Sequence, residues 1–207
     1  MKQWIAGAGL ALAAAALAQE LPPDELVKSV MLEVQGLIAQ DRDLQAGDRR
    51  KTVALIEQKV VPHFNFSGMT ALAVGASWQK ATPEQKKRLA EEFRTLLTRT
   101  YANSLAAFRD QKFDFRPLRM KPADTDVTVL VRVLQPGGEP VRVEYDMEKT
   151  PRGWKVYDLR VAGISLVVNY RTEFANLVRE NGIDGLIRTL EAKNKSPERP
   201  AAGSAKK

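Results

Sequence analysis

The chain has 207 residues, no cysteine, a single histidine and a formal net charge of +7. These counts exclude disulfides, thiolate chemistry and the usual zinc sites, which need several Cys or His ligands. A basic chain can bind nucleic acid or an anionic membrane surface. We expect no nucleic-acid partner here, because much of the basic excess lies in the last fifteen residues rather than in the folded part.

The first eighteen residues are typical of a cleaved secretory signal peptide. Lys2 is the only charged residue before Glu20, and an apolar run from Ile5 to Leu17 ends next to Ala18. A basic start, a short apolar stretch and a small-residue end are the usual features of such peptides. The run is shorter than the roughly 20 apolar residues of a membrane-spanning helix. We expect cleavage after Ala18 and a mature protein outside the cytoplasm; an uncleaved anchor is the alternative.

Three helices are predicted in the first part of the mature chain. Pro22-Pro23-Asp24 opens the first, with Asp24 as the expected N-cap. Asp48 opens the second, and Pro62 ends it because proline cannot continue a helix. The third starts at Ser67 and is a run of small residues from Gly68 to Val74, suited to close packing.

The strongest helix pattern begins at Thr82. Thr82 and Gln85 can form a capping box, and Pro83 between them suits the first helical position. Apolar residues then recur every three or four positions, which predicts one wide apolar stripe. The members of this stripe are Leu89, Phe93, Leu96, Leu97, Thr100, Tyr101, Leu105 and Phe108.

After Pro122 the apolar period changes from helical spacing to two. Alternating valines from Val127 to Val133 predict one strand. Apolar residues from Val141 to Met147 alternate with charged ones, as in an antiparallel strand buried on one side. Turns rich in Pro and Gly separate these strands from a third over residues 154–161. With Phe113–Phe115, the sequence predicts a meander of about four strands.

The C-terminal part is predicted to return to helix. Gly163 and Ser165 are expected to end the sheet, and a long helix follows until Asn181-Gly182, with a short helix from Ile183. This order predicts an α+β fold: a small antiparallel sheet packed by helices on its N- and C-terminal sides. The expected domain spans residues 19–192. Residues 193–207 are basic and rich in Pro, Ala and Ser, which predicts a disordered tail.

No catalytic arrangement is recognisable in the sequence. His63 stands alone and predicts neither a metal site nor a catalytic base. Gly163-Ile164-Ser165 lacks the closing glycine of a nucleophile elbow, and Gly137-Gly138 lies in a hairpin turn. Three acidic residues of the second long strand are expected to face solvent (Glu144, Asp146 and Glu148). We therefore predict a protein that is not an enzyme and uses no metal or cofactor.

The chain is rich in apolar residues that share helix and strand faces. A packed core is the ordinary explanation of such a pattern. An internal cavity for an apolar ligand is the alternative.

Several short motifs, in a fixed order, carry a family resemblance. The first block is Ala81-Thr82-Pro83-Glu84-Gln85 with Phe93, Tyr101 and Leu105. The second block comprises Val141–Tyr145, Gly153–Asp158, Gly163–Ser165, Tyr170-Arg171, Phe174 and Gly182–Leu186. Together, behind a signal peptide, they resemble the MlaC family of periplasmic phospholipid-binding proteins, also called the toluene-tolerance family. The resemblance covers about residues 24–193 and leaves out the basic tail.

This resemblance implies a carrier that shuttles phospholipid across the periplasm and so maintains outer-membrane lipid asymmetry. Its implied partners are an outer-membrane lipoprotein–porin complex and an inner-membrane ABC transporter with an MlaD-type subunit. The acyl chains would lie in an apolar cavity with the head group outside, so the phospholipid would be cargo rather than cofactor. From the residues alone, a periplasmic partner-binding or structural protein without lipid cargo stays open.

Ten side chains are predicted to line the lipid cavity, from the apolar pattern and the family positions together. They are Phe93, Leu97, Tyr101, Val129, Val131, Val143, Tyr145, Met147, Ile164 and Val168. The resemblance places Ile164 at a pocket position, and Val168 lies one helical turn further on. Arg142, Arg160 and Arg171 are the candidates for head-group or partner contacts.

Overall fold

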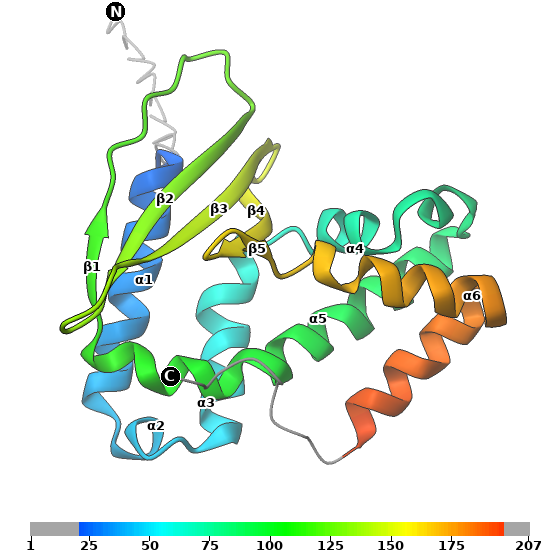
Figure 1. Ribbon diagram of the computed structural model, residues 1–207, viewed down its shortest axis with the longest axis horizontal. Helices are drawn as coiled ribbons and strands as arrows, with labels where there is room; N and C mark the ends of the chain where they lie inside the picture. Colours follow the sequence, from blue (N-terminus) through cyan, green and yellow to red (C-terminus); the bar gives the residue numbers. More distant parts are fainter. Residues whose placement is uncertain (1–20, 197–207) are drawn as a thin grey trace, which may run out of the picture.

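The structure, a computed structural model, describes residues 21–196, apart from the side chains of residues 103 and 106–108. The predicted signal peptide and most of the predicted tail lie outside the described residues. The helices are α1 (Pro23–Gln40), α2 (Arg42–Gln45), α3 (Arg49–Leu55), α4 (Phe66–Val74), α5 (Pro83–Ala106) and α6 (Arg171–Lys195). The strands are β1 (Lys112–Phe115), β2 (Asp126–Leu134), β3 (Val141–Thr150), β4 (Gly153–Val161) and β5 (Ile164–Ser165) (Figure 1).

The five strands form one antiparallel sheet in the order β1-β2-β3-β4-β5. The predicted meander is therefore confirmed, with one strand more than expected. Gly163–Ser165 was expected to end the sheet, but Ile164 and Ser165 pair with Val161 and Arg160. The reason is a two-residue turn: Ala162 and Gly163 both have positive φ (50° and 82°), which reverses the chain tightly enough for pairing to continue.

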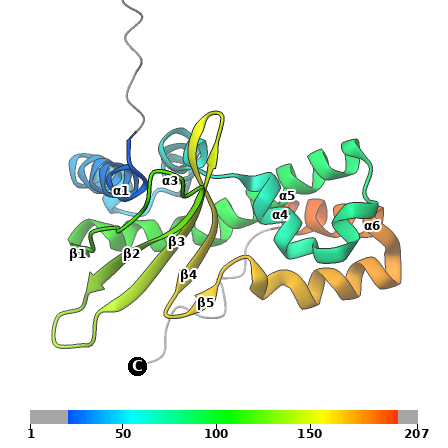
Figure 2. The same ribbon diagram turned by 90° about the horizontal axis from the view of Figure 1, so that it is seen from above.

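One face of the sheet packs against α1. The buried residues of this sheet cluster come from α1 and from β2, β3 and β4; Figure 1 shows α1 running along the strands, and Figure 2 shows it on one side of the sheet. Alternate positions face the helix because successive strand side chains point to opposite sides. The cluster comprises Val27, Met31, Val127, Val129, Val131, Met147, Trp154 and Val156.

A second core joins α4, α5 and α6. This helix cluster comprises Met69, Ala73, Val74, Leu89, Phe93, Leu97, Val167, Phe174, Leu186, Ile187 and Leu190. Its centre is aromatic: the ring of Phe93 meets Tyr170 and Phe174 edge-on, with centroids 5.2 and 5.3 Å away. A smaller group (Val34, Ile38, Leu44 and Leu55) ties α1, α2 and α3 together. Helix α5 runs from beside the sheet to the far end of the helical part (Figure 1).

The helix starts follow local capping chemistry. The predicted capping box is confirmed, because Thr82 Oγ1 accepts from Gln85 N (3.2 Å) and Gln85 Oε1 accepts from Thr82 N (3.0 Å). Asp48 caps α3 through Lys51 N. The prediction for Asp24 is wrong: Pro22 is the N-cap of α1, and the Asp24 carboxylate accepts from Leu118 N instead.

Two further starts differ from the sequence analysis. Asn65, not Ser67, caps α4 by accepting from Gly68 N. Helix α2 was not predicted, since four residues are too few for a periodic pattern; Asp41 caps it through the amides of Asp43 and Leu44.

Helix α6 is bent at Gly182, which has a φ of 67°, as the Asn181-Gly182 pattern predicts. Its second half extends to Lys195, so the expected start of the tail at Lys193 is too early. Asn194 is buried, and its Nδ2 donates to the carbonyl of Glu92 (2.9 Å). Arg99 donates to the carbonyls of Asn194 and Ser196, which satisfies the end of the helix. These contacts with α5 keep the last turn helical.

Candidate functional site

The ten predicted cavity residues fall in three places. On α5, Phe93 is fully buried, Leu97 is buried and Tyr101 is half-buried against the helix cluster. Burial raises the pKa of the Tyr101 phenol, and it raises that of Tyr170, which also interacts with Tyr101, to about 12. Both phenols stay neutral at physiological pH, so this end of the helix cluster is an uncharged aromatic surface.

Five of the ten lie on the strands. Val129, Val131 and Met147 belong to the sheet cluster, and Val143 pairs with Val131 across β2 and β3. Tyr145 packs against the same cluster and donates its hydroxyl hydrogen to the Met31 sulfur at 3.4 Å. Burial raises the pKa of the Tyr145 phenol. These five side chains therefore form one apolar surface, turned toward α1.

Ile164 and Val168 lie apart from both groups, on the surface between β4 and α6. Ile164 is 63% exposed and Val168 is 43% exposed. Their neighbour Val167 is completely buried in the helix cluster. The exposed pair thus lies at the junction between the sheet and the helices.

The two main clusters meet at Phe64. This side chain packs against both the helix cluster and the sheet cluster. Its neighbour Asn65 donates its backbone N–H to the carbonyl of Val156 at 2.8 Å, which fixes the start of α4 to the open edge of β4. The predicted cavity residues of α5 and of the strands therefore belong to two packed surfaces that share this contact.

A hollow of about 410 Å³ lies between α4 and the sheet. Small residues on α4 leave room for it, and an acidic pair on neighbouring strands, Asp126 and Glu148, forms part of its wall. Its lining comprises Gly68, Ala71, Leu72, Gly75, Trp78, Gln79, Asp126, Glu148 and Tyr157. None of the ten predicted residues lines it. The run of small residues on α4 was visible in the sequence, where it was interpreted as a close-packing surface.

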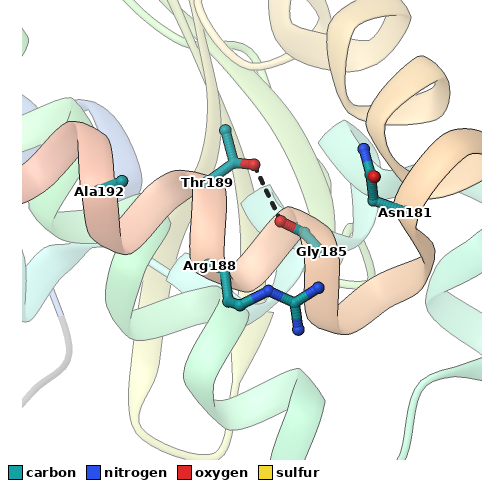
Figure 3. A pocket seen from close by; sticks show the side chains of 5 residues that line it. All are labelled: Asn181, Gly185, Arg188, Thr189 and Ala192. Carbon is teal, nitrogen blue, oxygen red and sulfur yellow. Dashed lines mark hydrogen bonds between the residues drawn. The ribbon is translucent and has the colours of Figure 1, made fainter.

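A second hollow of about 350 Å³ lies on the second half of α6 (Figure 3). It is lined by Asn181, Gly185, Arg188, Thr189 and Ala192, and the Thr189 hydroxyl donates to the carbonyl of Gly185 at 2.9 Å. Gly185 is required here, because a Cβ at this position would lie 2.2 Å from the Cβ of Asn181. None of the ten predicted cavity residues lines this hollow.

The acidic strand face is less solvated than the sequence analysis expected. Asp146 is only 6% exposed. It is held by Arg160 (Nη1 to Oδ2, 2.5 Å) and by the hydroxyl of Thr128 (2.7 Å). Burial raises the pKa of Asp146. The expectation that Asp146 faces solvent is therefore wrong, because the alternating pattern could not show that β3 and β4 bring Asp146 opposite Asp158 in the centre of the sheet.

Glu144 completes this polar network. Although burial opposes it, hydrogen bonds from Arg142 (2.6 Å) and Arg160 (3.3 Å) hold the pKa of Glu144 below its usual value. Two of the three candidate head-group arginines are thus engaged with carboxylates. Arg171, the third, lies at the start of α6 close to Gly75.

The hydroxyl of Ser165 is also engaged within the fold. It donates to Asp158 Oδ1 at 2.9 Å.

Burial, with the charge of Lys155, lowers the pKa of His63, so this imidazole is neutral at physiological pH. Within residues 21–196 no group of His, Asp and Glu side chains could hold a metal ion. Nor does any helix of this described part have the length and apolarity to cross a membrane.

A sequence model described as MlaC protein matches residues 28–192. The chain belongs to the MlaC family. The family resemblance read from the ordered motifs is thereby confirmed. A structure of the phospholipid-binding protein from Ralstonia solanacearum, in complex with a phospholipid, matches with a TM-score of 0.76 and 38% sequence identity. The match covers 84% of this chain and 97% of that chain, so the α+β fold of this MlaC-family member is confirmed.

Two characterised relatives extend the comparison. The toluene tolerance protein ttg2D of Pseudomonas putida is 24% identical over 188 residues, which is 86% of this chain and 87% of that protein. The intermembrane phospholipid transport system binding protein MlaC of Haemophilus influenzae is 21% identical over 146 residues, 69% of this chain and 68% of that protein. Lipid binding and transport, rather than a known class of enzyme, are the activities associated with this family.

Proposed function

We propose that this MlaC-family protein is a periplasmic carrier that binds phospholipid and shuttles it between the outer and the inner membrane. The observation that carries the proposal is the match to the Ralstonia protein, which was solved with a phospholipid bound and aligns over 97% of its length. Export through the signal peptide at residues 1–18 would place the carrier in the periplasm.

A carrier of this kind needs apolar surface rather than reactive groups. At about 0.8 kcal/mol per buried CH₂, an acyl chain of about 16 carbons costs roughly 13 kcal/mol when it is exposed to water. We propose that the aromatic surface of α5 and the apolar surface of the strands contact the acyl chains and so shield them from water. The chains would enter by separating the two clusters where they meet at Phe64, with Ile164 and Val168 at the rim. Arg142, Arg160 and Arg171 are the candidates for the phosphate.

The proposed partners follow from the same function. A lipid shuttle must receive its cargo at one membrane and deliver it at the other. We assign the outer-membrane step to a lipoprotein–porin complex and the inner-membrane step to an MlaD-type ABC transporter complex. The name of the Haemophilus relative, a component of an intermembrane phospholipid transport system, supports this assignment.

The first experiment is chemical extraction of the exported protein after purification. Mass spectrometry of the organic extract is expected to show phospholipid at a fixed ratio to protein. An extract free of phospholipid would favour the alternative, a periplasmic partner-binding or structural protein without lipid cargo.

A matched pair of variants tests the predicted rim. Ile164→Glu is expected to abolish co-purifying lipid, because a carboxylate at the rim cannot enter an apolar route without losing its water. The fold should survive, since Ile164 is 63% exposed. Leu32→Glu on α1, at a side chain that is 45% exposed, is the control and is expected to keep its lipid. Tyr101→Glu tests the inner surface. An unchanged amount of co-purifying lipid in both Ile164→Glu and Tyr101→Glu would show that the lipid does not bind at the predicted residues.

A further inference from the structure

The segment between β4 and α6 joins the sheet to the helices within a few residues. Ile164 and Ser165 form β5 on the sheet, whereas Val167 is fully buried in the helix cluster. We call residues 162–168 the strap. Because one part of the strap is paired with β4 and the other is buried in the helix cluster, a change in the position of the sheet relative to the helices would act on the strap.

One hydroxyl group fixes the shape of the strap. Ser165 Oγ donates to Asp158 Oδ1 (2.9 Å) and accepts from the backbone N–H groups of Val167 (3.2 Å) and Val168 (2.8 Å). Asp158 is only 5% exposed, and its Oδ1 also accepts from Leu159 N (2.8 Å). The Ser165–Asp158 hydrogen bond is partly buried, so it is exchanged for one to water less readily than a hydrogen bond on the surface. Ser165 therefore connects the strap to the interior of the sheet.

The turn at the start of the strap, at Ala162 and Gly163, is strained. Ala162 has a φ of 50°, in the left-handed region of backbone conformation that residues other than glycine and asparagine rarely adopt. Two backbone hydrogen bonds of 2.8 Å hold it, from Ala162 N to the carbonyl of Arg142 and from Leu166 N to that of Leu159. The observed conformation of the strap thus depends on a few specific hydrogen bonds.

We propose that Ser165 and Asp158 are positioning residues for phospholipid exchange. Their hydrogen bond holds Ile164 and Val168 at the junction and keeps the strap closed over the route between the clusters. Breaking it frees the strap and lets lipid enter and leave faster without changing the apolar surfaces that hold it. This inference rests on the proposed carrier function and adds a device that sets its rate.

The test compares Ser165→Ala with Ser165→Thr, which keeps the hydroxyl. Donor vesicles of phosphatidylethanolamine and phosphatidylglycerol carry a fluorescent phospholipid, and its transfer to acceptor vesicles of the same composition is followed. Ser165→Ala is expected to raise the transfer rate about five- to tenfold, which is the effect of losing one hydrogen bond. Lipid bound per protein at equilibrium should stay unchanged, and Ser165→Thr should transfer at the wild-type rate. Amide hydrogen exchange on the lipid-free proteins should show faster exchange at Val167 and Val168 in Ser165→Ala alone.

Asp158→Asn and Asp158→Ala form a second pair, which decides the question if Ser165→Ala does not fold. Asn keeps the accepting Oδ1 and should behave as wild type, whereas Ala should transfer faster. Equal transfer rates in the folded members of both pairs would overturn the inference, even if the amides exchange faster. A wild-type protein that neither carries nor transfers phospholipid would instead refute the proposed function, and the exchange data would still report on the hydrogen bond.

Discussion

Replacing Arg160 by methionine is expected to destabilise the protein in a pH-dependent way. Arg160 donates to Asp146 at 2.5 and 3.0 Å and to Glu144 at 3.3 Å. Removing one partner of a buried ion pair costs about 3–5 kcal/mol, whereas an exposed pair contributes at most about 1 kcal/mol. The Asp146 side chain is 9% exposed and that of Arg160 is 32% exposed. We therefore expect a loss of about 2–3 kcal/mol in the free energy of unfolding at pH 7.

The sign of the pH effect follows from Asp146. Burial already raises its pKa in the folded state, and loss of Arg160 removes an interaction that opposes the rise. A carboxyl whose folded pKa exceeds its unfolded pKa of about 4 favours folding only while it is protonated. This contribution is complete below the unfolded pKa and is lost as the pH rises through the folded pKa. The defect of Arg160→Met should therefore be largest at pH 7 and shrink toward pH 4.

Urea unfolding at pH 7 and pH 4 measures both effects, and the midpoint of thermal unfolding at pH 7 should fall by roughly 4–12 °C. Arg142→Met is the matched control. Arg142 also contacts Glu144, but its side chain is 61% exposed, so its removal should cost less than about 1 kcal/mol. Equal losses for the two variants, or a loss for Arg160→Met that does not change with pH, would refute this account of the buried network.

Two further predictions concern the helices. Thr82→Ala removes the capping box of α5 and should lower the unfolding free energy by about 1 kcal/mol, measured by urea unfolding. Thr95→Ala, which only loses a bond to the carbonyl of Glu91 within α5, should change it by less than about 0.5 kcal/mol; a larger effect would argue against the cap. Gly185→Ala should lower the melting temperature because of the clash on α6, whereas Gly36→Ala, with open space around it on α1, should stabilise by about 0.5–1 kcal/mol. A stable Gly185→Ala protein would show that α6 relaxes there at little cost.

Local patterns predicted the elements well wherever one signal dominated. The capping box at Thr82, the alternation from Val127 to Val133 and the break at Gly182 each depend on neighbouring residues, and the structure confirms all three. The sequence did not predict β5, because a two-residue strand has no period and exists only through its pairing with β4. Helix α6 runs past Lys193 for a similar reason: its last turn is held by α5, far away in the sequence.

The candidate site was harder to predict from the sequence. The spacing of apolar residues predicts which side chains are buried, but it does not predict which of the buried clusters each one belongs to. Phe93 and Val129 were grouped as one lining, whereas the structure places them in two clusters that meet at Phe64. The assignment of these residues to lipid remains a prediction. The polar network was missed because Asp146 and Asp158 become neighbours only through the register of β3 and β4.

The bend in α6 decides how this helix packs. A straight helix continues in one direction, but the positive φ of Gly182 changes the direction of α6 between its two halves. Beyond it, Asp184 and Glu191 are tied to α5 through Gln85 and Arg88. Both halves nevertheless pack in the helix cluster, the first through Phe174 and the second through Leu186 and Ile187, and an ion pair between Glu173 and Lys193 joins them across the bend. The bend therefore lets one continuous helix press two segments against the same core.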